Sequence, residues 1–208
     1  MQASDKKVVG IIAAIGAFLI ILVLVATSMY GIYFKTKEDS TTRFVANVLS
    51  LPAARVGSKR ISYSRFLKTR DAVRSYLNSP AGKADISVMP TAQELDNSII
   101  ENLIQQEMVK EVAEDLDVTV SDDDIRAIFA DVISAAASST TPDVAQYLYE
   151  NYGWNEEDFR QEVLRPALLA QNVAIKMANE AQGDETALDN YLQIRRGQPD
   201  VVIYLTLQ

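Results

Sequence analysis

The strongest hydrophobic pattern in the chain is an uninterrupted apolar stretch near its N-terminus. Val8 to Phe34 contains 27 residues without a formal charge and is rich in Ile, Leu, Val and Ala. As a helix it is about 40 Å long, more than the roughly 30 Å of a bilayer's hydrocarbon core. Tyr30 and Tyr33 lie at its end, where aromatic rings favour the interface. We predict a transmembrane anchor at residues 1–34 and a polar linker at 35–43.

A cleaved signal peptide is the alternative for this segment. Its apolar region is usually shorter, and Ala26 to Tyr30 matches a cleavage site poorly. The direction of insertion stays open, because basic residues flank the stretch on both sides. They are Lys6 and Lys7 before it, and Lys35, Lys37 and Arg43 after it, partly offset by Glu38 and Asp39.

Residues 44–208 form one predicted domain that is mainly helical. Phe44 to Val56 predicts extended chain, a turn at 57–59 and Arg60-Ile61 complete a hairpin, and Ser62 caps a helix that fades by Asn78. We predict a loop at 79–90. Thr91 and Glu94 then form a capping box ahead of a helix that ends near Asp115. This second helix has two adjoining apolar rows: Leu95, Ile99 and Leu103, and Ile100, Ile104, Met108 and Val112.

The second half of the domain is also predicted to consist of helices joined by short loops. Ser121 and Asp124 cap a third helix, a small-residue loop covers 135–141, and Thr141-Pro142 starts a short helix that stops at Gly153. Asn155 begins a long fifth helix that Pro166 kinks and Gly183 ends, followed by a short helix at 186–195. The predicted core row of the fifth helix is Phe159, Val163, Leu164, Leu168 and Met177.

The chain closes with a predicted strand from Asp200 to Leu207. An isolated strand leaves backbone groups unpaired, so we expect it to pair with residues 53–56 at the other end of the domain. The predicted fold is therefore a helical domain with a small sheet formed by its N- and C-terminal strands, with the second and fifth helices packed together.

Composition narrows the possible chemistry. The chain contains neither cysteine nor histidine, which removes thiolate nucleophiles, disulfides, the commonest general base and the commonest metal ligand. We predict no catalytic residues, no cofactor site and no metal site.

The charges are strongly segregated along the chain. Residues 43–74 hold eight basic residues and one acid, whereas residues 94–162 hold 18 acids and three bases. Such segments tend to pack together and neutralise each other within one fold, which is the favoured interpretation. The alternative is that the basic segment meets anionic headgroups beside the anchor. A tethered domain this acidic is not expected to bind nucleic acid.

The order of four motifs resembles a known family. They are the strand–turn–helix at Ala54–Phe66, the helix at Ile100–Val109, the connection at Val118–Ile125 and the Gly-Trp turn at Tyr152–Arg160. Over about residues 52–178 the chain is similar to the N-terminal chaperone domain of the SurA, PpiD and PrsA group of extracytoplasmic folding factors, which is related to the chaperone module of trigger factor.

The resemblance implies a holdase-like or scaffolding module outside the cytoplasm, anchored in the cell membrane by its N-terminal helix. Many relatives carry a parvulin prolyl isomerase domain after the long helix. Here only about 20 residues separate Gly183 from the closing strand, and the histidines common in parvulin sites are missing. The resemblance therefore implies no isomerase activity.

Candidate client-binding residues cluster around one turn. Tyr147, Tyr149, Tyr152 and Trp154 surround Gly153 and could offer soft aromatic surface to many sequences. The competing interpretation is that Trp154 and some of the tyrosines fill the core.

Two other motifs have simpler explanations. Ser87-Val88-Met89-Pro90-Thr91 resembles the serine motif of signal peptidases, which use a Ser–Lys dyad, but it opens into the most helical part of the chain. The acids at 122–124 and 156–158 lack the spacing and glycine of a calcium loop.

The resulting hypothesis is a membrane-anchored, extracytoplasmic chaperone-like protein that binds unfolded or newly translocated polypeptides. A membrane-tethered scaffold for one envelope partner is the alternative, and a Ser–Lys hydrolase is a remote third.

Overall fold

A computed structural model describes residues 23, 26–28, 30, 32–33, 40–137 and 143–206. Most of the predicted anchor, the first part of the linker and the predicted Thr141-Pro142 cap lie outside these residues. The described positions between Val23 and Tyr33 are helical. Within the described part of the chain, no helix combines the length and apolar content needed to cross a membrane.

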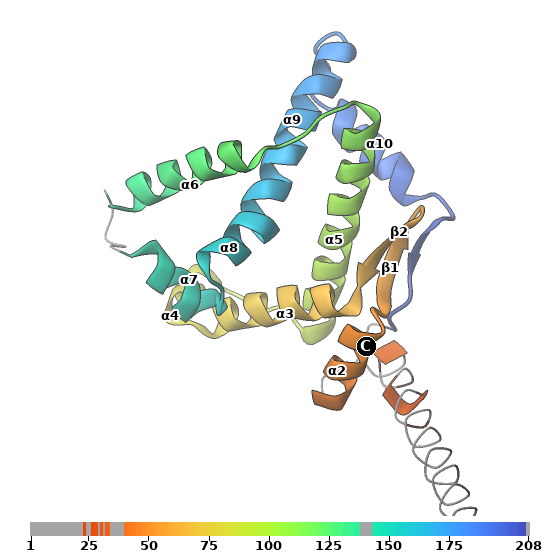
Figure 1. Cartoon of the computed structure of the whole chain (residues 1–208), viewed down its shortest axis with the longest axis vertical. Helices are drawn as coiled ribbons and strands as arrows, with labels where there is room; N and C mark the ends of the chain where they lie inside the picture. The colour runs from red at the N-terminus through yellow and green to blue at the C-terminus, as the bar shows by residue number, and fades with distance from the viewer. Residues whose placement is uncertain are drawn as a thin grey trace, which may run out of the picture.

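The fold is mainly helical with one small sheet (Figure 1). The elements of its first half are α2 (Ser40–Val48), β1 (Pro52–Val56), β2 (Lys59–Ser62), α3 (Tyr63–Asn78), α4 (Pro80–Asp85) and α5 (Ala92–Asp115). Those of its second half are α6 (Asp122–Ala137), α7 (Val144–Tyr152), α8 (Glu156–Phe159), the π-helix η1 (Arg160–Leu164), α9 (Arg165–Glu180), α10 (Ala187–Arg196) and β3 (Val201–Ile203).

The sheet joins the two ends of the domain, as predicted. Its strand order is β2-β1-β3, with β1 antiparallel to both neighbours. Arg55 pairs with Val202, and the Tyr204 amide donates to the Ala53 carbonyl oxygen at 2.9 Å. The strand itself spans three residues, shorter than expected. The N-terminal helix is connected to the same region, since the Thr206 amide donates to the Tyr33 carbonyl oxygen at 3.1 Å.

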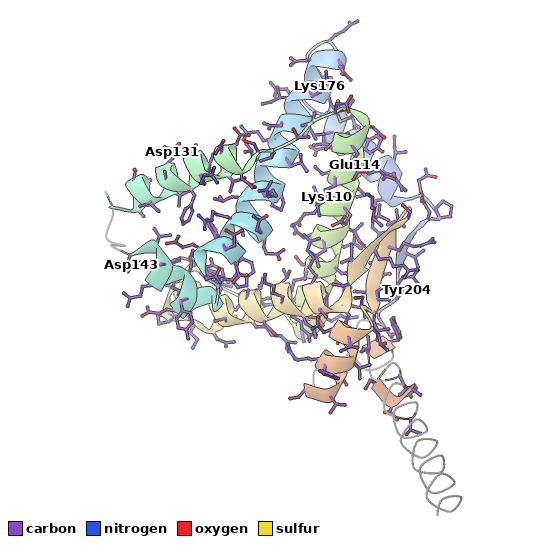
Figure 2. The ribbon with its side chains drawn as sticks, viewed as in Figure 1. Lys110, Glu114, Asp131, Asp143, Lys176 and Tyr204 are labelled. Carbon is purple, nitrogen blue, oxygen red and sulfur yellow. The ribbon has the colours of Figure 1, made fainter. Side chains whose placement is uncertain are left out.

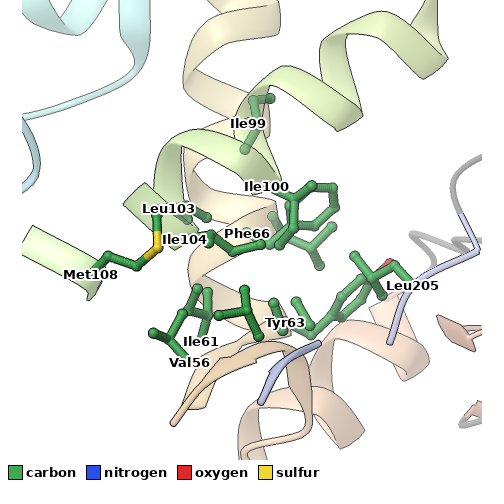
Figure 3. Packing of buried hydrophobic residues seen from close by; sticks show 14 of the residues in the cluster. Val56, Ile61, Tyr63, Phe66, Ile99, Ile100, Leu103, Ile104, Met108 and Leu205 are labelled. Carbon is green, nitrogen blue, oxygen red and sulfur yellow. The ribbon is translucent and has the colours of Figure 1, made fainter. Parts of the chain in front are cut away.

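The core forms where α3 and α5 meet the sheet. Val56 and Ile61 face Leu103, Ile104 and other side chains of the α5 rows (Figure 3), and all the predicted row residues of α5 are buried. The caps are also as predicted: Ser62 accepts from the Arg65 amide, and Thr91 and Glu94 form the capping box. Burying this stripe stabilises the domain at about 25 cal/mol per Å² of apolar surface.

Three local predictions are wrong. Residues 44–48 are helical rather than extended, because Thr42, Val45 and Ala46 follow a helical spacing that buries one face of α2, which begins at Ser40 within the predicted linker. Residues 80–85 form a short helix capped by Ser79, with Pro80 in its first turn, where proline costs little. Helix α6 continues through Ala137, into the stretch predicted as a loop.

The fifth-helix row is only partly correct. Val173, absent from the predicted row, is fully buried, and Met177 packs beside it on the core, whereas Val163 is 38% exposed. The cause is η1, whose wider turn rotates the faces of the helix before and after it out of register. Pro166 follows directly. Its ring would clash with the carbonyl of residue 162 in a regular α-helix, and a widened turn relieves such a clash.

The segregated charges neutralise each other within the fold, as expected. The basic face of α3 meets acids of α5, α8 and η1, with Arg65 2.7 Å from Glu107 and Lys68 2.8 Å from Asp158. Arg70 is fully buried, 3.2 Å from Asp96, and its guanidinium lies over the Phe66 ring. Pairing lowers the cost of burying these charges and fixes how the helices dock.

Candidate functional site

A cavity of about 430 Å³ lies between α3, α5, η1 and α9. Its lining is mostly apolar, with a smaller polar group. The apolar side chains are Ala72, Val73, Leu103, Val109, Tyr152, Trp154, Val163, Pro166, Ala167 and Ala170, and the polar ones are Thr69, Asn102, Gln105, Gln106 and Glu162. This size and composition are typical of ligand pockets, which combine apolar walls with a few placed polar groups.

The cavity floor is an extension of the core. Leu103 and Val109 are buried members of the main cluster, and Val73 and Ala170 pack against that cluster from α3 and α9. On the η1 and α9 side, Val163 and Ala167 remain exposed. Apolar surface of η1 and α9 therefore lines the cavity without being covered by the core.

An aromatic wall stands at the end of α7. Gly153 ends that helix with φ +68°, a left-handed conformation that glycine adopts at little cost. The turn places Tyr152 between two rings: its centroid is 4.9 Å from that of Tyr76, with the planes 5° apart, and 6.0 Å from that of Trp154. Tyr76 and Trp154 therefore extend one stacked surface from α3 to the cavity.

The far end of this stack is held by a hydrogen bond. The Tyr76 hydroxyl donates to the Asp85 carboxylate of α4. This bond, together with some desolvation and the nearby negative charge, raises the pKa of Tyr76 to about 12. Burial raises the pKa of Tyr152 as well. Both rings therefore stay neutral across the physiological range.

Neutral amides form much of the polar rim. Gln106 accepts from Arg65 at 2.7 Å and donates to Asn102 at 2.8 Å, so its orientation is fixed. Gln105 is exposed, and no hydrogen bond to its side chain occurs among the described residues. An amide both donates and accepts, as a peptide backbone requires. Glu162 contacts Arg65 and Lys68, which compensate its charge.

The predicted aromatic residues separate into two groups. Tyr152 and Trp154 line the cavity. Tyr147 lies behind them, its ring 6.4 Å from that of Tyr152, and Tyr149 is 73% exposed and does not line the cavity. Tyr152 and Trp154 are half-buried and do not belong to the main core cluster. A client-binding role for the four residues stays a prediction.

Comparison with known proteins identifies the family. The model of the SurA-like N-terminal domain matches residues 1–174. The chain belongs to this family. The match begins ahead of the predicted anchor and ends within α9, so the pairing of β3 with β1 extends beyond it. No curated protein and no solved structure matches the chain significantly. A SurA-like N-terminal domain is a chaperone-type domain.

Sequence analysis missed the cavity residues outside the aromatic turn of this SurA-like domain. The amides of α5 looked like ordinary solvated positions, and Tyr76 lies far from Tyr152 in sequence. The sequence does carry a signal for the core stripe beside the cavity: Ala170, Val173, Ala174 and Met177 of α9 follow the i, i+3, i+4, i+7 spacing of a buried face, and Ala170 also lines the cavity.

The surroundings of Ser87 differ from those of a Ser–Lys dyad. Ser87 is exposed in a bend between α4 and α5, and nearby Lys83 is exposed as well. A dyad lysine needs a lowered pKa. Hydrogen bonding to Glu114 instead raises the pKa of Lys59, and the pKa of Lys68 is raised despite partial burial, through its bonds to Asp158 and Glu162.

The two acidic runs serve as helix starts and ion-pair partners. Asp124 caps α6 with Ser121, and Asp158 forms a capping box with Asn155. Asp122 contacts Arg165, and Glu157 contacts Arg160. Among the described residues, no three acidic side chains converge as a metal ion would require.

Proposed function

We propose that this SurA-like domain binds unfolded or newly translocated polypeptides in the cavity between α3, α5, η1 and α9. The observation that carries the proposal is the combination of an apolar floor, exposed Val163 and Ala167, and a stacked aromatic wall with neutral amides beside it. Apolar side chains of a client would be buried on the floor, and its backbone would exchange hydrogen bonds with the rim.

The charge pattern supports selection by apolarity rather than by charge. Glu162 is the one ionisable residue of the cavity lining other than tyrosine, and Arg65 and Lys68 already compensate it. A site without a net uncompensated charge has no strong preference for clients of either sign. Such tolerance suits a chaperone that meets many sequences.

We further propose that the protein is anchored in the cell membrane by residues 8–34, with the domain outside the cytoplasm and without isomerase activity. The apolar length of that segment supports the anchor, and the family match includes it. The absence of histidine from the sequence, and the use of residues 187–203 for α10 and β3, support a binding role without an isomerase site.

The test is suppression of client aggregation by the full-length protein in lipid nanodiscs. We expect the wild type to slow aggregation at modest molar excess and Ala167→Asp to lose most of this effect, because a carboxylate would enter the apolar side of the cavity. Ile175→Asp is the control, since Ile175 is exposed on the same helix but does not line the cavity.

Equal suppression by wild type and Ala167→Asp would contradict binding in this cavity. No suppression by wild type, together with one saturable partner in cross-linking, would favour a scaffold for a specific envelope protein.

A further inference from the structure

The end of the N-terminal helix belongs to the core of the domain. Ile32 is fully buried in the cluster that also contains Val45 and Leu205, and Ser28, one turn earlier on the same face, is 4% exposed. The Tyr33 carbonyl oxygen accepts from the Thr206 amide. The helix therefore enters the domain as a packed element instead of ending at a free tether.

This packing sets a boundary for the part of the apolar segment that is free to contact lipid. Ser28 and Ile32 are buried, so their side chains are not surrounded by acyl chains. The 20 residues from Val8 to Thr27 remain. As a helix with a rise of about 1.5 Å per residue, this stretch would span about 30 Å, which equals the thickness of a hydrocarbon core. Residues 28–32 would then rise through the adjoining headgroup layer, which is roughly 5–7 Å thick on each side.

Helix α2 lies at the same end of the domain. In Figure 1 it projects below the sheet, as do the described residues of the N-terminal helix. Its buried face contributes Val45 and Ala46 to the cluster that holds Ile32. Its opposite face carries large apolar side chains in the open: Phe44 is 68% exposed and Val48, one turn later, 62% exposed, with Leu49 beyond them at 46%.

We propose that the Phe44–Val48 face of α2 inserts into the headgroup layer of the bilayer and fixes the domain on the membrane surface. The inference rests on the anchor in the proposed function. The occupant follows from position, because α2 packs through its buried Val45 and Ala46 in the same cluster as Ile32 of the N-terminal helix, which leaves the exposed face of α2 beside the proposed anchor. Tyr30 and Tyr204 are also exposed, and tyrosine favours the same layer.

The test uses the full-length protein in vesicles and depends on the absence of cysteine, which makes a single labelled position possible. An environment-sensitive fluorophore is attached in the variants Phe44→Cys, Val48→Cys, Val23→Cys and Ile175→Cys. Nitroxide groups are placed either near the lipid headgroup or deep in the acyl chain. Ile175 is the matched control, being exposed and adjacent to Lys176, which lies at the opposite end of the molecule (Figure 2).

We expect labels at 44 and 48 to shift to the blue and to be quenched mainly by the shallow nitroxide, and the label at 175 to be quenched by neither. The label at 23 would lie roughly 6 Å inside the hydrocarbon boundary and should be quenched by the acyl-chain nitroxide more strongly than the labels at 44 and 48. Quenching at 23 with none at 44 and 48 would overturn the insertion of α2 and leave the anchor standing. Absence of quenching at all four positions would overturn both. A blue shift at 44 and 48 without nitroxide quenching would indicate a protein partner and also overturn the proposal.

Discussion

Arg65 of α3 lies 2.7 Å from Glu107 of α5, and the same guanidinium reaches Glu162 of η1 at 3.4 Å and Gln106 at 2.7 Å. One side chain thus connects α3, α5 and η1, three of the four elements that frame the cavity. All three charged side chains are largely buried, so their interaction is weakly screened by water.

Removing this connection should destabilise the domain. We expect Arg65→Met to lower the free energy of unfolding by about 2–3 kcal/mol, because Glu107 would lose its partner across the helix interface and Glu162 one of two. Lys59→Met is the control: Lys59 and Glu114 are more than half exposed, and solvent-exposed pairs contribute little to stability. Urea unfolding measures both. Similar losses in the two variants would contradict the structural role of Arg65.

The closing strand offers a second test. Tyr204→Pro removes the amide that donates to the Ala53 carbonyl oxygen. We expect it to cost about 1–2 kcal/mol more than Tyr204→Ala, which keeps the amide. Thermal unfolding followed by circular dichroism compares the two. If they unfold alike, the pairing of β3 with β1 contributes little to stability.

The start of α5 should depend on its capping box. Thr91→Ala should lower the free energy of unfolding by about 1 kcal/mol, because the Glu94 amide in the first turn of α5 loses the hydroxyl oxygen that accepts its hydrogen bond. Thr119→Ala, at an exposed position outside the helices, should be nearly neutral. Urea midpoints at neutral pH provide the comparison, and a neutral Thr91→Ala would show that tertiary packing alone sets this helix end.

Much of the fold was predictable because it depends on local signals. The capping residues Ser62, Thr91 and Asn155 and the apolar rows of α5 predicted elements that the structure contains, and the need to pair a lone strand predicted β3 against β1. Helix α2 was missed since its buried face uses Thr42 and Ala46, which carry a weak hydrophobic signal.

The cavity was harder to predict, because it results from relationships between distant elements. Tyr152 and Trp154 were singled out from composition, yet their stacking on Tyr76 depends on how α7 packs on α3. Likewise, the periodicity of a regular helix places Val163 in the buried row and not at the opening of the cavity. Its position at the opening depends on the π-helical turn ahead of Pro166.

The bond between Tyr76 and Asp85 predicts a loss of stability in alkali. The pKa of Tyr76 is about 12 in the folded protein, above the value of about 10 expected when unfolded. The bond's contribution is therefore complete below pH 10 and declines as pH rises toward 12. The stability difference between wild type and Tyr76→Phe should shrink between pH 8 and pH 11 in urea unfolding. A constant difference would contradict this assignment.

The central claim is that unfolded polypeptides occupy the cavity, and Trp154 reports on it directly because it is the single tryptophan of the chain and lines that cavity. The measurement is titration of the full-length protein in nanodiscs with a tryptophan-free unfolded polypeptide, following emission and acrylamide quenching. We predict a saturable blue shift with reduced quenching, lost in Val163→Asp and retained in Ile175→Asp. Client binding that leaves the Trp154 signal unchanged, or that survives Val163→Asp undiminished, would contradict the account.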